Sequence, residues 1–537
     1  MMKRYLAAFA LLAFMLAGCK DNNPTPTPEP EPQPGPEVPV FAAPTNLNVE
    51  TPDGISAVLT WENASTDYDG VEVQKAGPSG KYKMMGNVPA GVMIFTDKDF
   101  TENGKYSYRI CTFKGNTYSD YAIVDFTIDG IPEPTPEISV TSISNEPNML
   151  VINYTVTDDL GGSVKNGIVW TADSTDPSLE NGESFEYWKN LRTGASGIGI
   201  LLNPTCPVKV RAYAKSITEG TVGYSEVIDV TPAEQPTPYN VSYEDITPSE
   251  LPSEIKVYKA HTTVTGHPLN IWYSIADLST GNVTLRTICT DSGKQKSSAM
   301  AKAQTENPYV FVNGGYFGGN ASVSYVLDKG VQKAENESFL ARKKSYYVSR
   351  GVFGVTSDAK SSVNWRFGRS VSGGPYFYDT PIPQIDGAPE LSPSKNFPSP
   401  AIDPGYYSAI GGGPVLVKDG KIRINFVMLD DVYLSNFELF PSDIYNRSTR
   451  QPRTAIGCTA DGKVVLMVVD GRNTGVSEGV ILTDLARLMT GVGCVDVMNL
   501  DGGGSSVFCV GSDMTVLNRP TDGTERAVVS AVGFAKK

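Results

Sequence analysis

Acidic residues and glycines cluster between residues 453 and 506, and we expect any chemistry to lie there. Asp470 begins Asp-Gly-Arg, Glu478 stands where a helix is predicted to start, and Asp501 begins Asp-Gly-Gly-Gly-Ser-Ser. Carboxyl groups placed in this way serve as general acids, general bases or nucleophiles. The chain has only 2 histidines, so His-rich zinc sites and most Ser-His-Asp arrangements do not fit it. We therefore expect catalysis to depend on carboxylates.

The elements around these residues predict how they meet. Residues 464–469 form a continuous apolar run, typical of a strand buried on both faces, and Asp470 follows it. A helix is predicted from about 479 to 490, and a second strand at 494–500 ends at Asp501. Such a crossover makes two strands of one sheet parallel, so both aspartates should leave the sheet at the same edge, with Glu478 near it. Ligands of open α/β sheets bind at that edge.

Each of these features also has an ordinary structural interpretation. Asp before Gly is a common turn, Glu in a first helical turn favours the helix dipole, and three glycines can form a flexible loop. Together they favour a site, because glycines after a buried strand suit close approach to a ligand or an anion-binding nest. Similar runs follow strands at Asn313-Gly-Gly and Gly411-Gly-Gly. None matches a nucleotide-binding loop or a hydrolase nucleophile elbow.

Length and charge set wider limits. The chain has 537 residues, which at roughly 150 residues per domain predicts three or more domains. It carries 45 basic and 59 acidic side chains, a formal net charge of −14, with no basic cluster. Nucleic acid is therefore not expected as a partner.

The N-terminus predicts export and lipidation. Lys3 and Arg4 precede an apolar stretch that ends in Leu-Ala-Gly-Cys19, which resembles a bacterial lipobox. Residues 1–19 are thus expected to be a lipoprotein signal peptide ending at a lipidated Cys19, and 20–39 a Pro-rich linker. This places the protein in the bacterial cell envelope, anchored by lipid to the outer membrane, facing the periplasm or the surface. Export permits disulfides, but we expect most of the other six cysteines to be buried thiols.

Two further Pro-rich breaks, at 131–137 and 231–239, divide the rest of the chain. They predict all-β sandwiches at 40–130 and 135–232, because short alternating runs are separated by Gly, Asn and Asp turns. The first resembles fibronectin type III domains in its Trp-bearing early strand and Tyr-bearing late strand, and the second is similar but more divergent. We interpret both as spacers; the alternative is glycan binding through exposed aromatics such as Tyr187 and Trp188.

The remaining segment, 240–537, is predicted to be an α+β catalytic domain with a mixed sheet. Asp-Gly turns within 416–422 and 459–464 read as hairpins. Helices are expected at 480–490 and 297–305. Since the Pro-rich breaks should separate independent cores, we expect a chain starting near 240 to fold and keep its activity.

A set of motifs in this segment resembles the phosphodiester glycosidase family, over roughly residues 255–537. In order, they are Asn313-Gly-Gly-Tyr-Phe, Gly411-Gly-Gly-Pro-Val-Leu, Arg453-Thr-Ala-Ile-Gly, Asp470-Gly-Arg, Ser477-Glu-Gly, Leu500-Asp-Gly-Gly-Gly-Ser-Ser, Asn518-Arg-Pro and Arg526. The resemblance implies an envelope-anchored hydrolase that cleaves a sugar-1-phosphodiester into the sugar and a phosphomonoester. It fixes neither the sugar nor the anomer.

The resemblance also implies residue roles. Glu478 and Asp501 are the expected catalytic pair, with Asp470 beside them, and their separation would decide between retention and inversion. Arginine suits a phosphate better than lysine does. The expected substrate- and phosphate-binding residues are Asn313, Gly314, Gly412, Gly413, Arg453, Thr454, Arg472, Gly502, Gly503, Ser505 and Arg526.

Several alternatives stay open at this point. The same groove could bind glycan without cleaving it, as in a non-catalytic surface glycan-binding lipoprotein, or it could hydrolyse ordinary O-linked glycans. No cofactor is certain, and a divalent cation bridging phosphate and Asp470 is left open. The membrane is expected as a partner only through the lipid anchor, and the oligomeric state and disulfide pairing are not fixed by the sequence.

Overall fold

The computed structural model describes residues 42–341, 344–370, 373–385, 387–423, 426–429, 432–435, 437–440 and 449–537. The expected signal peptide, Cys19 and the linker at 20–39 lie outside the described residues. The chain divides into two compact units, Met1–Glu133 and Pro134–Lys537. Of the helices that the structure describes, none is both long and apolar enough to cross a bilayer.

The first unit contains a two-sheet β-sandwich. Trp61, on an early strand, and Tyr108, on a late strand, are buried in its core, and the Tyr108 hydroxyl donates to Asp97 Oδ2 at 2.6 Å. One sheet has the order β1 (Thr45–Glu50), β2 (Ala57–Glu62), β5 (Ile94–Asp97); the other has β4 (Tyr82–Pro89), β3 (Gly70–Ala76), β6 (Gly104–Lys114), β7 (Thr117–Tyr118), with β8 (Ala122–Ile128) also on β6.

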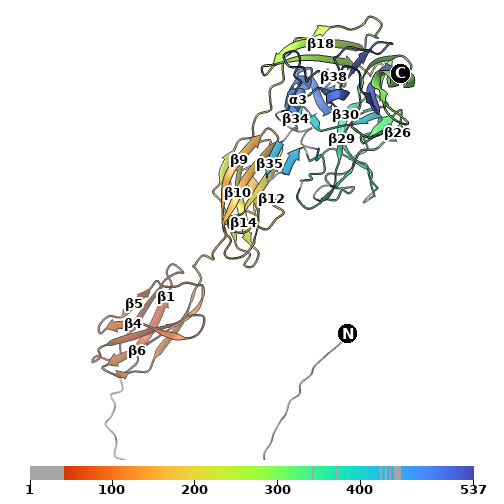
Figure 1. The fold of residues 1–537 in the computed structure, drawn as a ribbon. Coiled ribbons are helices and arrows are strands. Elements are labelled where there is room, and N and C mark those ends of the chain that lie inside the picture. Colours follow the sequence, from red (N-terminus) through yellow and green to blue (C-terminus); the bar gives the residue numbers. More distant parts are fainter. Residues whose placement is uncertain are drawn as a thin grey trace, which may run out of the picture. The chain divides into compact units, whose positions relative to one another are not determined.

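The second unit begins with another sandwich (Figure 1). Tyr187 is buried in its core and Trp188 is half-buried beside it, so the interpretation of Tyr187 as an exposed binding aromatic is wrong. One of its sheets has the order β13 (Ser196–Leu202), β10 (Met149–Asp158), β9 (Glu137–Glu146). The other has the order β12 (Glu183–Glu186), β11 (Val164–Thr171), β14 (Val208–Ser216), β15 (Val222–Tyr224), with β16 (Ile228–Val230) also paired to β14.

This second sandwich shares apolar core with the rest of its unit. Ile385, Ala388 and Phe437, all from the C-terminal part of the chain, are buried in the sandwich's core cluster. The Asn148 side chain, which lies beside β10, also donates to the main-chain oxygen of Ile422. The Pro-rich break near 235 therefore does not separate two independent cores.

Three larger sheets form the C-terminal part. The first is β17 (Glu244–Asp245), β18 (Ile255–Val264), β19 (His267–Ala276), β38 (Val464–Val469), β37 (Arg453–Thr459), β39 (Cys494–Asn499), β33 (Val415–Lys418), β34 (Lys421–Ile422); the second is β20 (Val283–Cys289), β43 (Ser530–Lys536), β22 (Pro308–Asn313), β40 (Phe508–Val510), β41 (Thr515–Val516); the third is β26 (Val331–Ala334), β25 (Val326–Asp328), β32 (Tyr406–Gly411), β29 (Arg350–Thr356), β30 (Ser361–Phe367), β31 (Tyr376–Tyr378).

Four small two-stranded sheets complete the list of strands. They are β21 (Gln295–Lys296) with β42 (Ala527–Val528), β23 (Phe317–Gly318) with β24 (Ala321–Ser322), β27 (Phe339–Ala341) with β28 (Ser345–Tyr347), and β35 (Phe426–Leu429) with β36 (Val432–Ser435). The three larger sheets share one apolar cluster that includes Val312, Phe353 and Leu466. This common core fixes the sheets relative to one another.

The order β38-β37-β39 decides how the predicted site assembles. Both β38 and β39 pair with β37 in antiparallel register, so they run parallel to each other with β37 between them. The two aspartates do leave the same edge. The mixed sheet, however, was a wrong prediction: every strand pairing among the described residues is antiparallel, because the Asp461-Gly462 turn folds β37 directly against β38.

Strands dominate this region, so the α+β expectation is met only in part. The described α-helices are α1 (Ser297–Gln304) and α3 (Leu482–Gly491), both close to their predicted positions. Helix α3 starts later than expected, and Glu478 lies in the loop before it rather than in its first turn. The buried face of α3, which includes Leu485 and Met489, packs into a core with β38 and β39.

All six cysteines after residue 41 are free thiols, and four of them are buried: Cys111, Cys458, Cys494 and Cys509. Burial raises the pKa of the Cys458 thiol to about 11. The expectation that most of these cysteines act as buried hydrophobic residues is therefore confirmed.

Because the second sandwich shares core residues with the C-terminal part, we predict that a chain starting at 240 is destabilised. Ile385, Ala388 and Phe437 lose apolar cover, and each fully buried large apolar side chain contributes about 1.5–3 kcal/mol. Calorimetry should show the final melting transition at least about 5 °C lower than in the whole chain. A chain starting at 134 is the matched control and should melt like the whole chain. Equal melting of both truncations would contradict the shared core.

Candidate functional site

Three elements of the eight-stranded sheet bring the predicted charged residues to one edge. Strand β37 begins with Arg453, which pairs in register with Val469, the last residue of β38. Asp470 follows β38, and Asp501 follows β39. Because β37 runs opposite to its two neighbours, its first residue lies where they end. The sequence predicted that Asp470 and Asp501 leave the sheet at one edge, and the structure places Arg453 at that edge as well.

Asn313 joins this edge to the five-stranded sheet. It ends β22 and is fully buried. Its Nδ2 donates to the main-chain oxygen of Asp501 at 2.7 Å, and its Oδ1 accepts from the Thr454 hydroxyl at 2.7 Å. Asn313 and Thr454 were predicted to bind substrate, but both side chains are used up in holding two sheets together.

The glycines after Asp501 lie against arginine side chains. A methyl group added at Gly504 would lie 1.9 Å from Arg526 Nη2, and one at Gly503 would lie 3.1 Å from Arg472 Nη2. A methyl group at Gly502 would first meet the Pro452 main-chain oxygen at 2.9 Å, and it would lie 3.7 Å from Arg453 Cδ. Arg453 is buried, whereas Arg472 and Arg526 are exposed. The structure therefore collects all three predicted arginines around one glycine loop.

Two of these arginines are held by neighbouring side chains. Arg526 Nε donates to Asp522 Oδ2 at 2.7 Å, with both side chains 40% exposed. Arg472 Nε donates to Gln451 Oε1 at 2.7 Å. Both of these hydrogen bonds use Nε, and in each arginine Nη2 is the atom nearest to the glycine loop. An exposed pair of this kind contributes little stability.

Asp501 sits partly exposed between the arginines and the buried edge. Burial raises the pKa of its carboxyl group, opposed by the nearby Ser505 hydroxyl, by the hydrogen bond from the Gly502 N–H at 2.9 Å and by the charge of Arg526. Ser505 itself is buried in the 3₁₀ turn η2 (Gly503–Ser505). A carboxyl group with a raised pKa can donate a proton nearer to neutral pH than an ordinary aspartic acid.

Asp470 is more enclosed than Asp501. Its Oδ1 accepts from Asn518 Nδ2 at 2.9 Å and its Oδ2 from the Arg519 N–H at 3.0 Å. Burial raises its pKa, and these donors oppose the rise. Among the described residues, no group of three His, Cys, Asp or Glu side chains could hold a metal ion. Asp470 thus ties the Asn518-Arg-Pro segment to the edge.

Glu478 contacts a different part of the molecule. Its Oε2 lies 2.5 Å from His267 Nδ1, and its Oε1 accepts from the Gly475 N–H at 3.2 Å. The His267 contact is the largest cause of the lowered pKa of Glu478. None of these described contacts is shared with Asp501, so the structure does not bring the predicted catalytic pair into contact. The catalytic role of Glu478 stays a prediction.

The other two glycine runs pack against each other and against strands. A methyl group at Gly315 would lie 2.2 Å from the main-chain oxygen of Gly411, and one at Gly412 would lie 2.5 Å from that of Asn499. At these positions glycine is needed because main chains approach closely. Gly314, also predicted to bind substrate, is buried and would meet Ser530 instead.

Next to these runs is a small cavity of about 170 Å³. The Arg350 guanidinium lies over the Phe440 ring, 3.8 Å from its centroid, and Arg350 Nη2 is 3.8 Å from Glu337 Oε2. The Tyr316 hydroxyl donates to the Gly413 main-chain oxygen at 2.8 Å. The lining residues are Tyr316, Val323, Ser324, Glu337, Arg350, Gly412 and Phe440.

This cavity adjoins the arginine cluster through Tyr316. Burial raises the pKa of the Tyr316 hydroxyl, the Asp501 carboxylate adds to the rise, and the charges of Arg453 and Arg350 oppose it. The three charged groups therefore each act on the Tyr316 hydroxyl. The candidate site is the combination of the cavity with Asp501 and the glycine loop.

Sequence reasoning missed Arg350, Glu337 and Phe440. Arg350 begins β29 and Glu337 lies in the loop after β26, so neither belongs to a glycine motif. Tyr316 does lie in Asn313-Gly-Gly-Tyr-Phe and could have been identified there. An arginine at the start of an apolar strand was the available signal for Arg350.

Glu438 forms the wall behind the cavity. Its carboxylate is fully buried and accepts from the Val415 N–H at 2.9 Å, the Gly351 N–H at 3.1 Å and Trp365 Nε1 at 3.2 Å. Burial nevertheless raises the pKa of Glu438 to about 6. Glu438 is thus a third carboxyl group with a raised pKa, after Asp501 and Asp470, and three donors hold it in place.

We predict that Glu438 makes stability fall between pH 4.5 and pH 6. Its ordinary pKa is 4.5 and its pKa in the fold is about 6, so the folded state binds the proton more tightly than the unfolded state does. The contribution of Glu438 to the free energy of unfolding is fully present below pH 4.5, and it decreases by about 2 kcal/mol as the pH rises through 6. The Glu438→Gln variant has no carboxyl group that titrates at this position. The loss in the free energy of unfolding that the substitution causes, measured by urea unfolding, should therefore be about 2 kcal/mol smaller at pH 7 than at pH 4.5. A cost that does not change with pH would contradict the prediction.

Comparisons with known proteins give limited similarity over parts of the chain. A segment of 85 residues is 40% identical to the SPbeta prophage-derived uncharacterized protein YomE of Bacillus subtilis (strain 168), covering 16% of this chain and 13% of that protein. The catalytic domain of zebrafish N-acetylglucosamine-1-phosphodiester alpha-N-acetylglucosaminidase, auto-inhibited by its pro-peptide, is 17% identical with a TM-score of 0.36, covering 56% of this chain and 89% of that chain. A two-domain fibronectin type III segment of chicken tenascin is 18% identical with a TM-score of 0.22, covering 35% and 97%.

The sequence model of one family matches the region that holds the site. It spans residues 307–535 and is described as phosphodiester glycosidase. This range contains Tyr316, Arg350, Arg453, Asp501 and Arg526. Residues 307–535 are therefore a domain of the phosphodiester glycosidase family.

Proposed function

We propose that this chain hydrolyses a sugar-1-phosphodiester, releasing the sugar and a phosphomonoester. The observation that carries the proposal is the placement of Arg453, Arg472 and Arg526 around the glycine loop that directly follows Asp501. Such a site pairs a proton donor with a cluster able to bind an anion. The match to the family over 307–535 supports the same reaction type.

The arginine cluster would hold the phosphate. A guanidinium group is planar and can bind a phosphate in a bidentate manner through two parallel N–H donors. Such charge-assisted hydrogen bonds are about twice as strong as neutral ones. Arg472 and Arg526 are exposed and can reach a substrate. Buried Arg453 is part of the same edge and supplies positive charge from below.

Asp501 would act as the general acid. In the proposed step, water attacks the anomeric carbon while the bond from that carbon to the phosphate oxygen breaks. The oxygen leaves with its electron pair and takes the Asp501 proton, and the water loses a proton to a second carboxylate. The products are a sugar with a free anomeric hydroxyl and a phosphomonoester, so atoms and charge balance.

The second carboxylate has two candidates. Glu337 lines the cavity next to Tyr316 and Gly412, and its side chain is 44% exposed. Glu478, the residue predicted from sequence, has both oxygens engaged by His267 and Gly475. We assign the role to Glu337, with Glu478 holding the 470–479 loop that carries Arg472.

The setting of the reaction is proposed from the sequence. The lipobox-like sequence at Cys19 supports anchoring in a bacterial envelope, and the proposed substrates are envelope or dietary glycans with glycosyl-phosphate links. A divalent cation near Asp470 remains a separate proposal, and both carboxylate oxygens of Asp470 already accept a hydrogen bond. A surface protein that binds glycan without cleaving it would keep the arginine cluster but would not need the proton donor Asp501.

We predict that Asp501→Asn lowers turnover of a sugar-1-phosphodiester by at least about 10²-fold, because the loss of a general acid typically costs that much. Glu337→Gln should produce a loss of the same order, whereas Glu478→Gln should cost less than tenfold. The substrates are N-acetylglucosamine-1-phosphomethyl and the corresponding glucose-1-phosphomethyl. The rates are measured by monitoring the release of free sugar with chromatography. Circular dichroism checks that each variant is folded.

The comparison between the glutamates decides the assignment. A large loss in Glu478→Gln with near wild-type activity in Glu337→Gln would restore the pair predicted from sequence. Near wild-type activity in folded Asp501→Asn would remove the aspartate from the mechanism.

We also predict that the arginines discriminate between charged and neutral substrates. Arg526→Ala should lower cleavage of the phosphodiester by about 10²-fold or more, since one lost donor to developing charge costs about 10²–10³ in rate. Any cleavage of a matched nitrophenyl glycoside should change much less. Arg453→Ala is expected to behave similarly, and the ratio of kcat/KM for the two substrates is the readout.

Gly504→Ala tests the same contact without removing a charge. The added methyl group would displace the Arg526 guanidinium, which is the flexible end of its side chain, so folding should be preserved while the phosphodiester preference falls. Gly318→Ala is the matched control, because its methyl group meets only Val323 at 3.5 Å. Equal losses on both substrates would point to general positioning rather than phosphate binding.

A further inference from the structure

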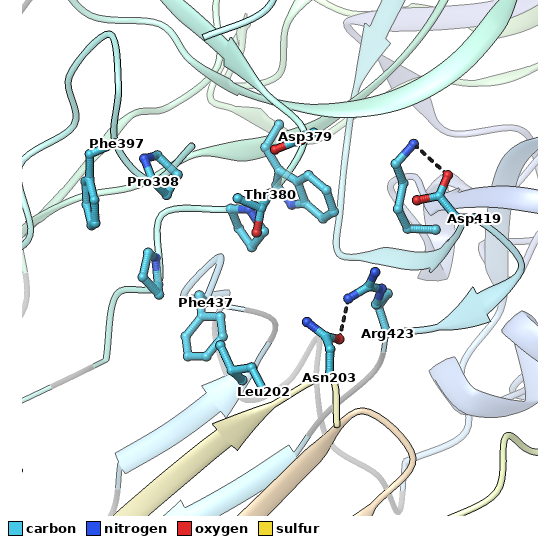
Figure 2. Close-up of a pocket in the computed structure, with 13 residues that line it drawn as sticks. Leu202, Asn203, Asp379, Thr380, Phe397, Pro398, Asp419, Arg423 and Phe437 are labelled. Carbon is cyan, nitrogen blue, oxygen red and sulfur yellow. Dashed lines mark hydrogen bonds and ion pairs between the residues drawn. The ribbon is translucent and has the colours of Figure 1, made fainter. Parts of the chain in front are cut away.

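A second and larger cavity lies between the second sandwich and the C-terminal part of the same unit (Figure 2). It encloses about 520 Å³. Leu202 and Asn203 line it at the end of β13, and Asp379, Phe397 and Arg423 line it from the other side. None of these residues takes part in the candidate site around Asp501. The sandwich thus supplies one wall of a cavity whose other wall belongs to the glycosidase domain.

The lining combines apolar rings with charges that cancel. Phe397 and Phe437 present ring surface. Asp379 and Asp419 carry negative charge, and Lys418 and Arg423 carry positive charge, so the ionic side chains of the lining sum to zero. A sugar has apolar faces that lie against rings and hydroxyl edges that exchange hydrogen bonds. A neutral oligosaccharide therefore fits this surface better than a polyanion or a purely apolar ligand.

The cavity continues into a neighbouring one of about 380 Å³. Leu202, Pro383 and Phe437 line both, and the second extends to Trp188. Together they offer a length of surface that exceeds a single sugar ring and that ends on a half-buried indole.

Two buried donors in these cavities have no acceptor among the described residues: Arg423 Nε and Trp188 Nε1. The Arg423 guanidinium otherwise donates through Nη1 to Asn203 Oδ1. A buried donor without a partner costs about 1–3 kcal/mol. Both N–H groups are closed off from solvent, so ligand hydroxyl groups would reach them only if the two side chains shift.

One short segment links this cleft to the candidate site. Phe437 lines the cleft and Phe440 lines the small cavity beside Arg350. Glu438, between them, is fixed by Trp365, which also lines the cleft. The two cavities therefore share the wall formed by residues 437–440.

We propose that this cleft binds a neutral oligosaccharide belonging to the substrate, so that the second sandwich is part of substrate recognition and not a spacer. The inference deepens the proposed function and rests on it only for the identity of the bound molecule as substrate. Binding itself is independent of cleavage.

The experiment measures binding and cleavage separately in the mature full chain. Isothermal titration with cellohexaose, maltohexaose, mannohexaose, xylohexaose and chitohexaose should give saturable binding of at least one. The double variant Asn203→Ala, Asp379→Ala should weaken it at least tenfold. Hydrolysis of N-acetylglucosamine-1-phosphomethyl and the glucose analogue, which are too short to reach the cleft, should stay within twofold of wild type. Asp229→Ala, an exposed change on the same sandwich, is the control and should bind normally.

The outcomes separate the two proposals. Hexasaccharide binding that is lost in the double variant supports the cleft even if no phosphodiester is cleaved, in which case only the proposed function fails. Cleavage without binding of any of the five hexasaccharides overturns the cleft. Unchanged affinity in the folded double variant also overturns it, as does tighter binding of a heparin hexasaccharide than of every neutral one.

Discussion

The buried Asn313 side chain is the interaction on which the site depends. Asn313 ends a strand of the five-stranded sheet, yet it bonds to Thr454 and to the main chain of Asp501, both on the eight-stranded sheet. Leaving such buried groups without partners costs about 1–3 kcal/mol each, so the two sheets can meet in only one register. That register sets where the Asp501 carboxylate and the Arg453 side chain emerge. Asn499 does the same on the next strand: its Nδ2 lies 2.8 Å from the Tyr316 hydroxyl and 3.0 Å from the Gly413 oxygen.

These two asparagines change the meaning of the glycine motifs. Once the sheets are held this closely, the main chains at Gly315, Gly411 and Gly412 leave no space for a side chain. Those glycines serve the assembly of the edge. Of the three glycine runs, the loop after Asp501 is the one that lies against arginine side chains, and its glycines border the proposed phosphate position. The same sequence feature therefore has two physical causes, which the structure distinguishes by what a methyl group would meet.

Local patterns were enough to predict the edge itself. The apolar run before Asp470, the Asp-Gly hairpin and the strand before Asp501 were visible in sequence, and crossover geometry placed the two aspartates together. The Asp-Gly hairpin also implied that β37 pairs with β38, but it did not indicate that β37 lies between β38 and β39 in the sheet. Contacts over long sequence separations were not predictable: Glu478 meets His267 across 211 residues, and Arg350 reaches the cavity from a different sheet. The shared core of Phe437 and the second sandwich was missed because Pro-rich breaks indicate linkers in the chain and not the absence of contact between its parts.

The net charge of −14 adds a constraint on any anionic substrate. At physiological ionic strength the Debye length is about 8 Å, so the acidic surface repels a phosphodiester only weakly until it is close. Within that distance the proposed charge-assisted bonds from Arg472 and Arg526 would outweigh the repulsion from the distant acids. Such a protein gains no long-range steering toward its substrate and must depend on contacts made after encounter. An oligosaccharide cleft beside the reacting centre would supply contacts of that kind, since neutral recognition is insensitive to the charge of the surrounding surface.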